Sequence, residues 1–278
     1  MPAPDAITPD KLSKLIGTPR CPLILDNRRD AVRAEDPRVL PTSRVLTESE
    51  MEAAAIHRMI PSITGPVVVA CAEGHGRSQG LAALLRSRGI GAEYLEGGYT
   101  AWRSAGLPLF DPQKITARDP EGRSVWVTRS RPKVDRIACP WLIRRFVDPR
   151  AVFLYVAPVE VANVAELLGA VPFDVEDTFW SHRGDLCTFD VMLTEFGLKL
   201  PALDRLATIV RGADTARPDL APEAPGLLAA ALGLSRMYSD DLEQLEAGMA
   251  LYDVFYRWCR DATEETHNWP TNRPGGAA

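Results

Sequence analysis

The stretch that decides the fold is Val67-Val68-Val69-Ala70-Cys71-Ala72-Glu73-Gly74-His75-Gly76-Arg77-Ser78. It opens with four consecutive apolar residues, which is typical of a strand buried on both faces. The residues from Ser78 to Arg88 then carry leucines at helical spacing, so they predict a helix. A buried strand, a short glycine-containing loop and a helix, in this order, form the unit from which parallel sheets are built.

Further elements of the same kind lie on both sides of this stretch. Apolar runs at Leu23-Ile24-Leu25 and from Ala92 to Leu95 predict two more buried strands. Helical patterns begin at Thr8 and at Thr47, and the second should reach about Met59. Strands that alternate with helices predict an α/β domain with a parallel sheet and helices on both faces.

With 278 residues the chain is long enough for two domains. The polar segment 111–124, DPQKITARDPEGRS, has proline and glycine but no periodicity, so we expect a linker there. The predicted organisation is a first domain at 1–110, the linker at 111–124, a second domain at 125–270 and a disordered tail at 271–278. The second domain should be a mostly helical α+β unit, with a strand at 125–127 and its clearest helix from Ser239 to about Asp261.

The overall composition narrows the classes of function. A net charge of -5 argues against a general nucleic-acid binder, and no apolar run is long enough to cross a bilayer. The N-terminus lacks the pattern of a signal peptide. Five scattered cysteines without a Cys-x-x-Cys pair suggest reduced thiols, so we expect a cytoplasmic protein. The sequence does not indicate an oligomeric state.

The loop after the strand at 67–70 has the residues of a nucleophilic site. Two glycines let backbone N–H groups turn inward beside a helix N-terminus, which makes an anion site and lowers the pKa of a neighbouring thiol. Cys71 is therefore the candidate nucleophile, with Arg77 as a fixed positive charge for an oxyanion. The candidate substrate- or anion-binding residues are Glu73, Gly74, His75, Gly76 and Ser78. The alternatives are that Cys71 is a buried structural cysteine and that His75 is a solvated loop residue.

This loop resembles that of the rhodanese family of sulfurtransferases. Two further segments carry the likeness: Leu25-Asp26-Asn27-Arg28 and Leu95-Glu96-Gly97-Gly98-Tyr99-Thr100-Ala101-Trp102. The resemblance covers roughly Ile7 to Phe110. It implies a rhodanese domain in which Cys71 takes a sulfane sulfur from a small-molecule donor as a persulfide and passes it to a thiol acceptor. It implies no cofactor for this domain.

The loop departs from ordinary sulfurtransferases in its length. The segment from Cys71 to Arg77 is one residue longer, which is similar to the rhodanese-fold phosphatases and arsenate reductases. However, Ala70 stands where cysteine phosphatases commonly have histidine. Three hypotheses therefore stay open: a sulfurtransferase, a thiol-dependent oxyanion reductase or phosphatase, and a non-catalytic oxyanion sensor or regulator.

The second half resembles the C-terminal domain of chromate-resistance ChrB proteins, over about Val125 to Trp269. The likeness is carried by the four segments 131–146, 181–190, 209–214 and 233–238. It implies a link to chromate or another oxyanion. The usual N-terminal region of these proteins differs from the one present here, so a DNA-binding role is not implied.

Two groups of residues in this half have possible ligand chemistry. His182, Cys187 and Asp190 offer imidazole, thiolate and carboxylate within nine residues, a partial transition-metal site to which Asp253 could add a ligand. The alternative is a hydrogen-bonded core histidine. The second group consists of basic residues, which could hold an anion; the alternative is that they pair with acidic residues. Its members are Arg129, Arg131, Lys133, Arg136, Arg144 and Arg145.

Overall fold

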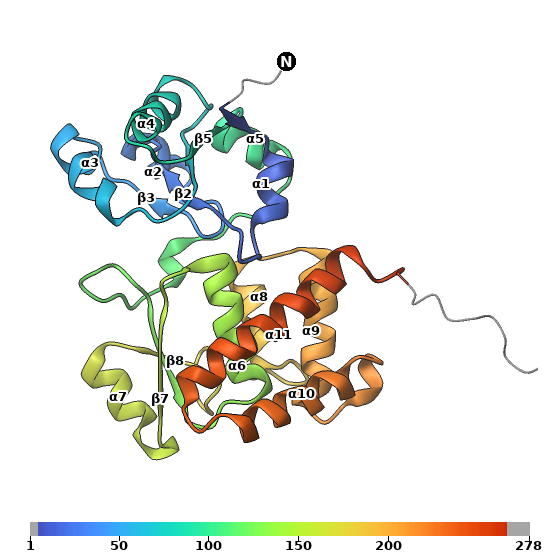
Figure 1. The fold of residues 1–278 in the computed structure, drawn as a ribbon. Helices are drawn as coiled ribbons and strands as arrows, with labels where there is room; N and C mark the ends of the chain where they lie inside the picture. Colours follow the sequence, from blue (N-terminus) through green and yellow to red (C-terminus); the bar gives the residue numbers. More distant parts are fainter. Residues whose placement is uncertain (1–4, 266–278) are drawn as a thin grey trace, which may run out of the picture.

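The structure, a computed structural model, describes residues 5–265 and contains two parallel sheets with helices packed around them (Figure 1). The first sheet has five strands in the order β1-β5-β4-β2-β3, and every neighbouring pair is parallel. Its three central strands are those that the apolar runs predict. The edge strands β1 and β3 have two residues each and were not predicted. The bounds are β1 Ala6–Ile7, β2 Leu23–Asp26, β3 Arg44–Val45, β4 Val67–Ala70 and β5 Ala92–Leu95.

Strand β4 shows why helices cover both faces of this sheet. Val67 and Val69 pack in one apolar cluster with residues of α3 (Ala53–Met59) and α4 (Gly76–Ser87). Val68 and Ala70 pack in another cluster with residues of α1 (Pro9–Leu15) and α5 (Gly98–Ser104). Because alternate residues of a strand point to opposite faces, these two clusters lie on the two sides of the sheet. The predicted α/β class is confirmed.

The helix expected from Thr47 begins later than predicted. The hydrogen bonds of a capping box do form: the Thr47 N–H donates to Glu50 Oε2 at 3.0 Å, and the Glu50 N–H donates to Thr47 Oγ1 at 3.2 Å. They close a turn, however, and α3 starts at Ala53. The Glu50 carboxylate also accepts from Arg44 at 2.7 Å, which ties this turn to β3 instead of extending it into a helix.

The second half is rich in helices, as predicted, but it also contains a three-stranded parallel sheet in the order β7-β6-β8. Only β6 (Val125–Arg129) was predicted; β7 (Val152–Val156) and β8 (Val171–Pro172) were not. Helix α6 (Val134–Leu142) and the π-helix η3 (Ile143–Val147) connect β6 to β7. The helices that follow are α7 Val161–Leu168, α8 Thr188–Phe196, α9 Pro201–Asp214, α10 Ala224–Met237 and α11 Asp241–Asp261.

The two halves share one apolar core. The cluster on the α1 and α5 side of the first sheet continues into residues of α6, η3 and α11. At Gly17 the chain runs so close to the second half that a Cβ atom would lie 2.4 Å from Phe146 Cζ and 2.8 Å from Tyr256 Cε1. The Thr42 N–H also donates to the Phe146 carbonyl at 3.1 Å. The two halves therefore contact each other directly as well as through the connecting segment.

The connecting segment itself is short of regular structure. Within 111–124 there is one 3-10 turn, η2 (Pro112–Lys114), and an isolated antiparallel bridge between Arg118 and Ser124. The predicted domain limits stay a prediction, and the predicted disordered tail lies outside the described residues. Between residues 5 and 265 the structure has no helix that combines the length and the apolar character needed to span a bilayer.

Candidate active site

Cys71 follows directly after the last residue of β4, and α4 begins five residues later at Gly76. The loop therefore lies at the carboxyl end of a central strand, where parallel sheets place their ligands. Cys71 is 6% exposed, so the residue is buried beneath the loop. The structure thus places the candidate nucleophile between the end of a strand and the N-terminus of a helix, as the sequence predicts.

The surroundings of the Cys71 sulfur favour its ionised form. Its Sγ atom lies 3.1 Å from the hydroxyl oxygen of Ser78, which is itself fully buried. Burial raises the pKa of the thiol, but the Ser78 hydroxyl and the backbone N–H groups of Glu73, Ser78 and His75 more than offset it. The pKa of Cys71 is therefore below its ordinary value. A lowered pKa increases the thiolate fraction of Cys71 at a given pH, and the thiolate is the nucleophilic form.

The floor of the loop is made by a second glycine segment. Gly98 has a φ of +58°, and a Cβ atom there would lie 2.4 Å from the Cys71 carbonyl oxygen and 2.5 Å from the Gly74 nitrogen. The next residue, Tyr99, donates its N–H to the same Cys71 carbonyl at 2.9 Å. Gly74 has a φ of +70°, and a Cβ atom there would lie 2.6 Å from the Leu95 carbonyl oxygen. The Gly97-Gly98 segment, which carries much of the rhodanese likeness, therefore supports the Cys71 loop from below.

Arg77 makes its contacts away from the sulfur. Its Nε donates to the carbonyl of Asn27 at 2.5 Å, and its Nη2 donates to Glu48 at 2.8 Å. The Asn27 side chain in turn donates to the Arg77 carbonyl at 3.0 Å. Arg77 thus ties the start of α4 to the end of β2. This geometry favours a positioning role over the expected contact with an oxyanion.

The remaining predicted loop residues lie around the opening. The side chains of His75 and Glu73 are mostly exposed, and their Nδ1 and Oε2 atoms lie 3.4 Å apart. Gly76 is the first residue of α4 and has open space where a Cβ atom would be. These residues can meet a substrate only as it enters the loop, whereas Ser78 lies beside the sulfur.

Two of the predicted metal residues, Asp190 and Asp253, have other partners in the structure. The Cys187 thiol lies beside Asp135, where burial raises the pKa of the carboxyl and the thiol partly offsets that rise. Cys187 is the N-cap of α8, and Asp190 belongs to the same capping box: its Oδ2 accepts from the Cys187 N–H at 3.1 Å and its Oδ1 from Arg211 at 2.8 Å. Asp253 accepts from Trp141 and Arg145. These carboxylates have other partners, so the expectation that they join His182 as metal ligands needs correction.

His182 instead meets acidic residues from other elements. Its Nε2 lies 3.2 Å from Asp214, 3.3 Å from Asp174 and 3.6 Å from Asp135. Asp135 is in the first turn of α6, and Asp214 is the last residue of α9. Sequence reasoning missed all three aspartates. The available signal was Asp135 itself, an acidic residue in the first turn of the largely apolar helix Val134–Leu142.

Residues 126–259 match the family model of the ChrB C-terminal domain. Protein ChrB of Cupriavidus metallidurans is 36% identical to this chain over 157 residues, which are 55% of this chain and 47% of that protein. The chain therefore spans about half the length of this relative. The ChrB-like region contains the His182 cluster.

The first half is similar to rhodanese-like domains among solved structures. A rhodanese-like domain protein from Staphylococcus aureus is 26% identical, and the likeness covers 35% of this chain and 90% of that chain with a TM-score of 0.30. A rhodanese-related protein from Thermoplasma volcanium is 21% identical, with 37% and 95% coverage and a TM-score of 0.31. A thiosulfate sulfurtransferase from Pseudomonas aeruginosa is 25% identical, with 40% and 20% coverage and a TM-score of 0.31.

The basic residues of the ChrB-like region are largely paired. Arg129 and Arg136 contact Asp174, and Arg144 and Arg145 contact Glu246 and Asp253. The guanidinium of Arg131 donates to backbone carbonyls of Ser235 and Tyr238. These contacts agree with the alternative in which the basic group neutralises acids, and they leave less charge for a bound anion.

Proposed function

We propose that this protein is a rhodanese-type sulfurtransferase in which Cys71 carries the transferred sulfur as a persulfide. The observation that carries the proposal is the position of the Cys71 sulfur, 3.1 Å from the Ser78 hydroxyl with loop N–H groups around it. These donors stabilise the Cys71 thiolate, which attacks the donor and is regenerated when the sulfur leaves; in the persulfide the negative charge lies on the outer sulfur, one bond away from Sγ. Cys71 acts as the nucleophile, and Ser78 and the loop backbone are the groups that bind the charge.

The reaction has two displacements. The Cys71 thiolate attacks the outer sulfur of a donor such as thiosulfate; the new sulfur–sulfur bond forms, and the old one breaks with its electron pair leaving on sulfite. An acceptor thiolate then attacks the outer sulfur of the persulfide and regenerates the Cys71 thiolate. No metal or redox cofactor is needed for either displacement, and charge stays on sulfur or on the leaving group throughout.

The position of Arg77 favours sulfur transfer over chemistry on a tetrahedral oxyanion. An oxyanion cradle relies on a guanidinium aimed at the anion. Here the guanidinium of Arg77 is held by Asn27 and Glu48. The extra residue of the loop still supports the oxyanion reductase or phosphatase as a second candidate. The likeness of the second half to ChrB supports a role for either activity in resistance to chromate or a related oxyanion.

Mass spectrometry of the intact protein tests the proposal directly. After incubation with thiosulfate we expect Cys71 to become one sulfur atom heavier, and addition of a thiol should remove that atom. Cys71→Ser should abolish the gain, because a serine hydroxyl does not ionise at neutral pH. Cys21→Ser is the matched control, since Cys21 lies outside the loop and is the other cysteine with some exposure; it should behave as the wild type.

Other outcomes would reject the proposal in favour of its alternatives. No sulfur on Cys71, together with reduction of chromate or arsenate or hydrolysis of an aryl phosphate, would identify an oxyanion enzyme. Tight binding of an oxyanion without any product would identify a sensor or regulator.

A further inference from the structure

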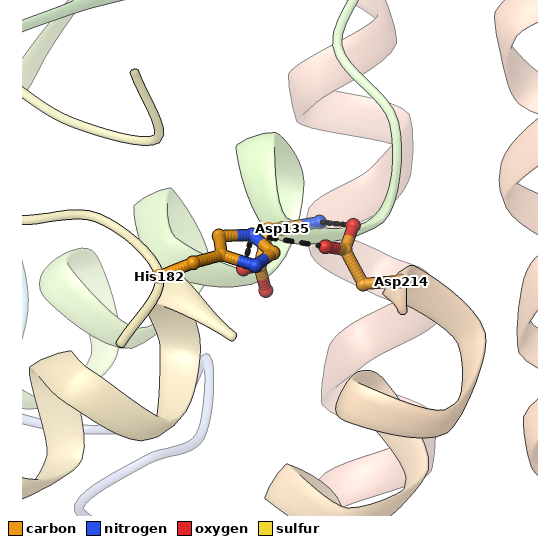
Figure 2. Close-up of side chains that lie close together, drawn as sticks. All are labelled: Asp135, His182 and Asp214. Carbon is orange, nitrogen blue, oxygen red and sulfur yellow. Dashed lines mark hydrogen bonds and ion pairs between the residues drawn. The ribbon is translucent and has the colours of Figure 1, made fainter. Parts of the chain in front are cut away.

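The His182 cluster lies well outside the Cys71 loop, in the second half of the chain. Three side chains from separate elements converge there: Asp135 from α6, Asp214 from the end of α9, and His182 from the segment between β8 and α8 (Figure 2). One potential ligand atom from each of the three lies within 4.8 Å of the other two. The side chain of His182 is 40% exposed, so the cluster is accessible from solvent.

The distances are those expected around a single metal ion. Two donors that bind one ion at about 2.1 Å lie roughly 3.0–3.4 Å apart at the angles of tetrahedral or octahedral coordination. His182 Nε2 lies 3.2 Å from Asp214 Oδ2 and 3.6 Å from Asp135 Oδ2. Little movement would therefore bring the three donors into contact with one ion.

A second observation points to a missing partner at this place. The side chain of Asp135 is 1% exposed, and its Oδ1 atom is buried without a hydrogen-bond partner. Its Oδ2 atom, the one that lies 3.6 Å from His182 Nε2, accepts from the Thr188 N–H at 2.6 Å and from the Phe189 N–H at 3.4 Å. A buried carboxylate oxygen with no donor is costly, because it has lost water and gained nothing. A cation would supply the missing interaction.

The negative charge of the cluster exceeds its positive charge, so it can accept a divalent cation. Asp174 also lies near His182, but it is paired with Arg129 and Arg136 and accepts from the Thr188 hydroxyl. The carboxylates of Asp135 and Asp214 face a single imidazole. Two close carboxylates of this kind are neutralised by one divalent ion.

We propose that Asp135, His182 and Asp214 bind one divalent transition-metal ion. Two carboxylate oxygens and one imidazole nitrogen suit first-row ions such as Zn²⁺ and Mn²⁺. Three protein ligands leave at least one coordination position open, and the exposure of His182 places that position towards solvent, where a water molecule or a small anion can bind. Asp174 lies beside the imidazole as an outer carboxylate, held by its two arginines.

Isothermal titration of the full-length protein with Zn²⁺ and, separately, Mn²⁺ tests this site after treatment with a chelator. We expect about one ion per chain for at least one metal, together with a higher melting temperature. Asp214→Asn and His182→Gln should each weaken the affinity by roughly tenfold or more, since changes even to outer groups at metal sites have effects of that size. His57→Gln is the matched control, because His57 is exposed and lies in the first half; it should bind as the wild type.

Loss of metal binding in a variant must be distinguished from loss of folding. Asp214 and His182 are both partly exposed, so their amide replacements should fold, and circular dichroism of each variant checks this. A visible absorption spectrum of the Co²⁺-loaded protein gives a second measurement, which His182→Gln should change. Failure of both metals to bind near one per chain would overturn the proposal. So would equal affinities in the wild type and in a folded Asp214→Asn variant, and His182 would then be an ion-paired histidine.

Discussion

The hydroxyl of Ser78 and the sulfur of Cys71 are buried partners, 3.1 Å apart across the loop that joins β4 to α4. The Ser78 hydroxyl also lies 3.1 Å from the His75 carbonyl oxygen, which is a second possible acceptor for its hydrogen bond. The serine can therefore donate to the thiolate when Cys71 is ionised and to the carbonyl when it is not. This makes Ser78 the side chain on which the reactivity of Cys71 depends most directly.

Removal of that hydroxyl should make Cys71 a weaker nucleophile. We expect Ser78→Ala to raise the pKa of the Cys71 thiol and to slow sulfur transfer by about tenfold, the effect of roughly one charge-assisted hydrogen bond. The measurement is the rate of Cys71 alkylation against pH. Ser87→Ala is the control, since Ser87 is in the same helix but exposed. An unchanged alkylation profile in Ser78→Ala would show that the loop backbone alone stabilises the thiolate.

The cysteines of the chain should react at different pH values. The pKa of Cys71 is lowered, whereas burial raises the pKa of Cys21 and brings that of Cys259 to about 11. The rate of alkylation is proportional to the fraction of thiolate. Cys71 should therefore react at a lower pH than the other cysteines, and its reaction should be lost only as the pH falls through its depressed pKa. Peptide mapping after iodoacetamide treatment between pH 6 and pH 9, a range around the ordinary thiol pKa of about 8.5, measures this order. Modification of Cys21 before Cys71 would contradict it.

A side chain at Gly98 should damage the loop. A Cβ atom there would lie 2.4 Å from the Cys71 carbonyl oxygen, so Gly98→Ala must displace the nucleophile. We expect a loss of about 1–3 kcal/mol in the free energy of unfolding and a loss of sulfur transfer. Gly89→Ala is a matched control: Gly89 also has a positive φ, +80°, but nothing lies within 4 Å of its added Cβ. Equal effects of the two substitutions on activity would mean that backbone strain, not the contact with Cys71, is responsible.

Two variants can distinguish whether Arg77 positions the loop or binds the substrate anion. If Arg77 positions the loop through Glu48, then Glu48→Gln should reproduce the effect of Arg77→Lys: a lower melting temperature and a modest fall in kcat, with KM for thiosulfate nearly unchanged. If Arg77 binds the substrate anion, Arg77→Lys should raise KM strongly and Glu48→Gln should not. Steady-state kinetics of the two variants decide between these roles.

The Cys71 loop could be predicted because its determinants are contiguous. The apolar strand, the two glycines and the start of the helix all lie within 67–88, and each has a local pattern. The edge strands β1 and β3 could not be found, since two residues are too few to show a period. The Thr47 capping box formed its hydrogen bonds without starting a helix, because those bonds also suit a turn held by Arg44.

The cluster of Asp135, His182 and Asp214 could not be predicted for a different reason. Asp135 and Asp214 are 79 residues apart and meet only because α6 and α9 pack together. The spacing of His182, Cys187 and Asp190 suggested a local site, but the cap of α8 and Arg211 use the last two. Residues that are close in the sequence suggested a local site, whereas tertiary packing brings Asp135 and Asp214 to His182 from distant elements.

The close contact at Gly17 makes the stability of the two halves interdependent. Gly17 has a positive φ, and the rings of Phe146 and Tyr256 fill the space that a side chain would need. The contact is therefore close-packed and accepts only glycine at this position. The junction between the two halves is stiff at this point, since any side chain at Gly17 would press against Phe146 and Tyr256 of the second half. Because one apolar core runs through both halves, loss of this contact should lower the stability of both together.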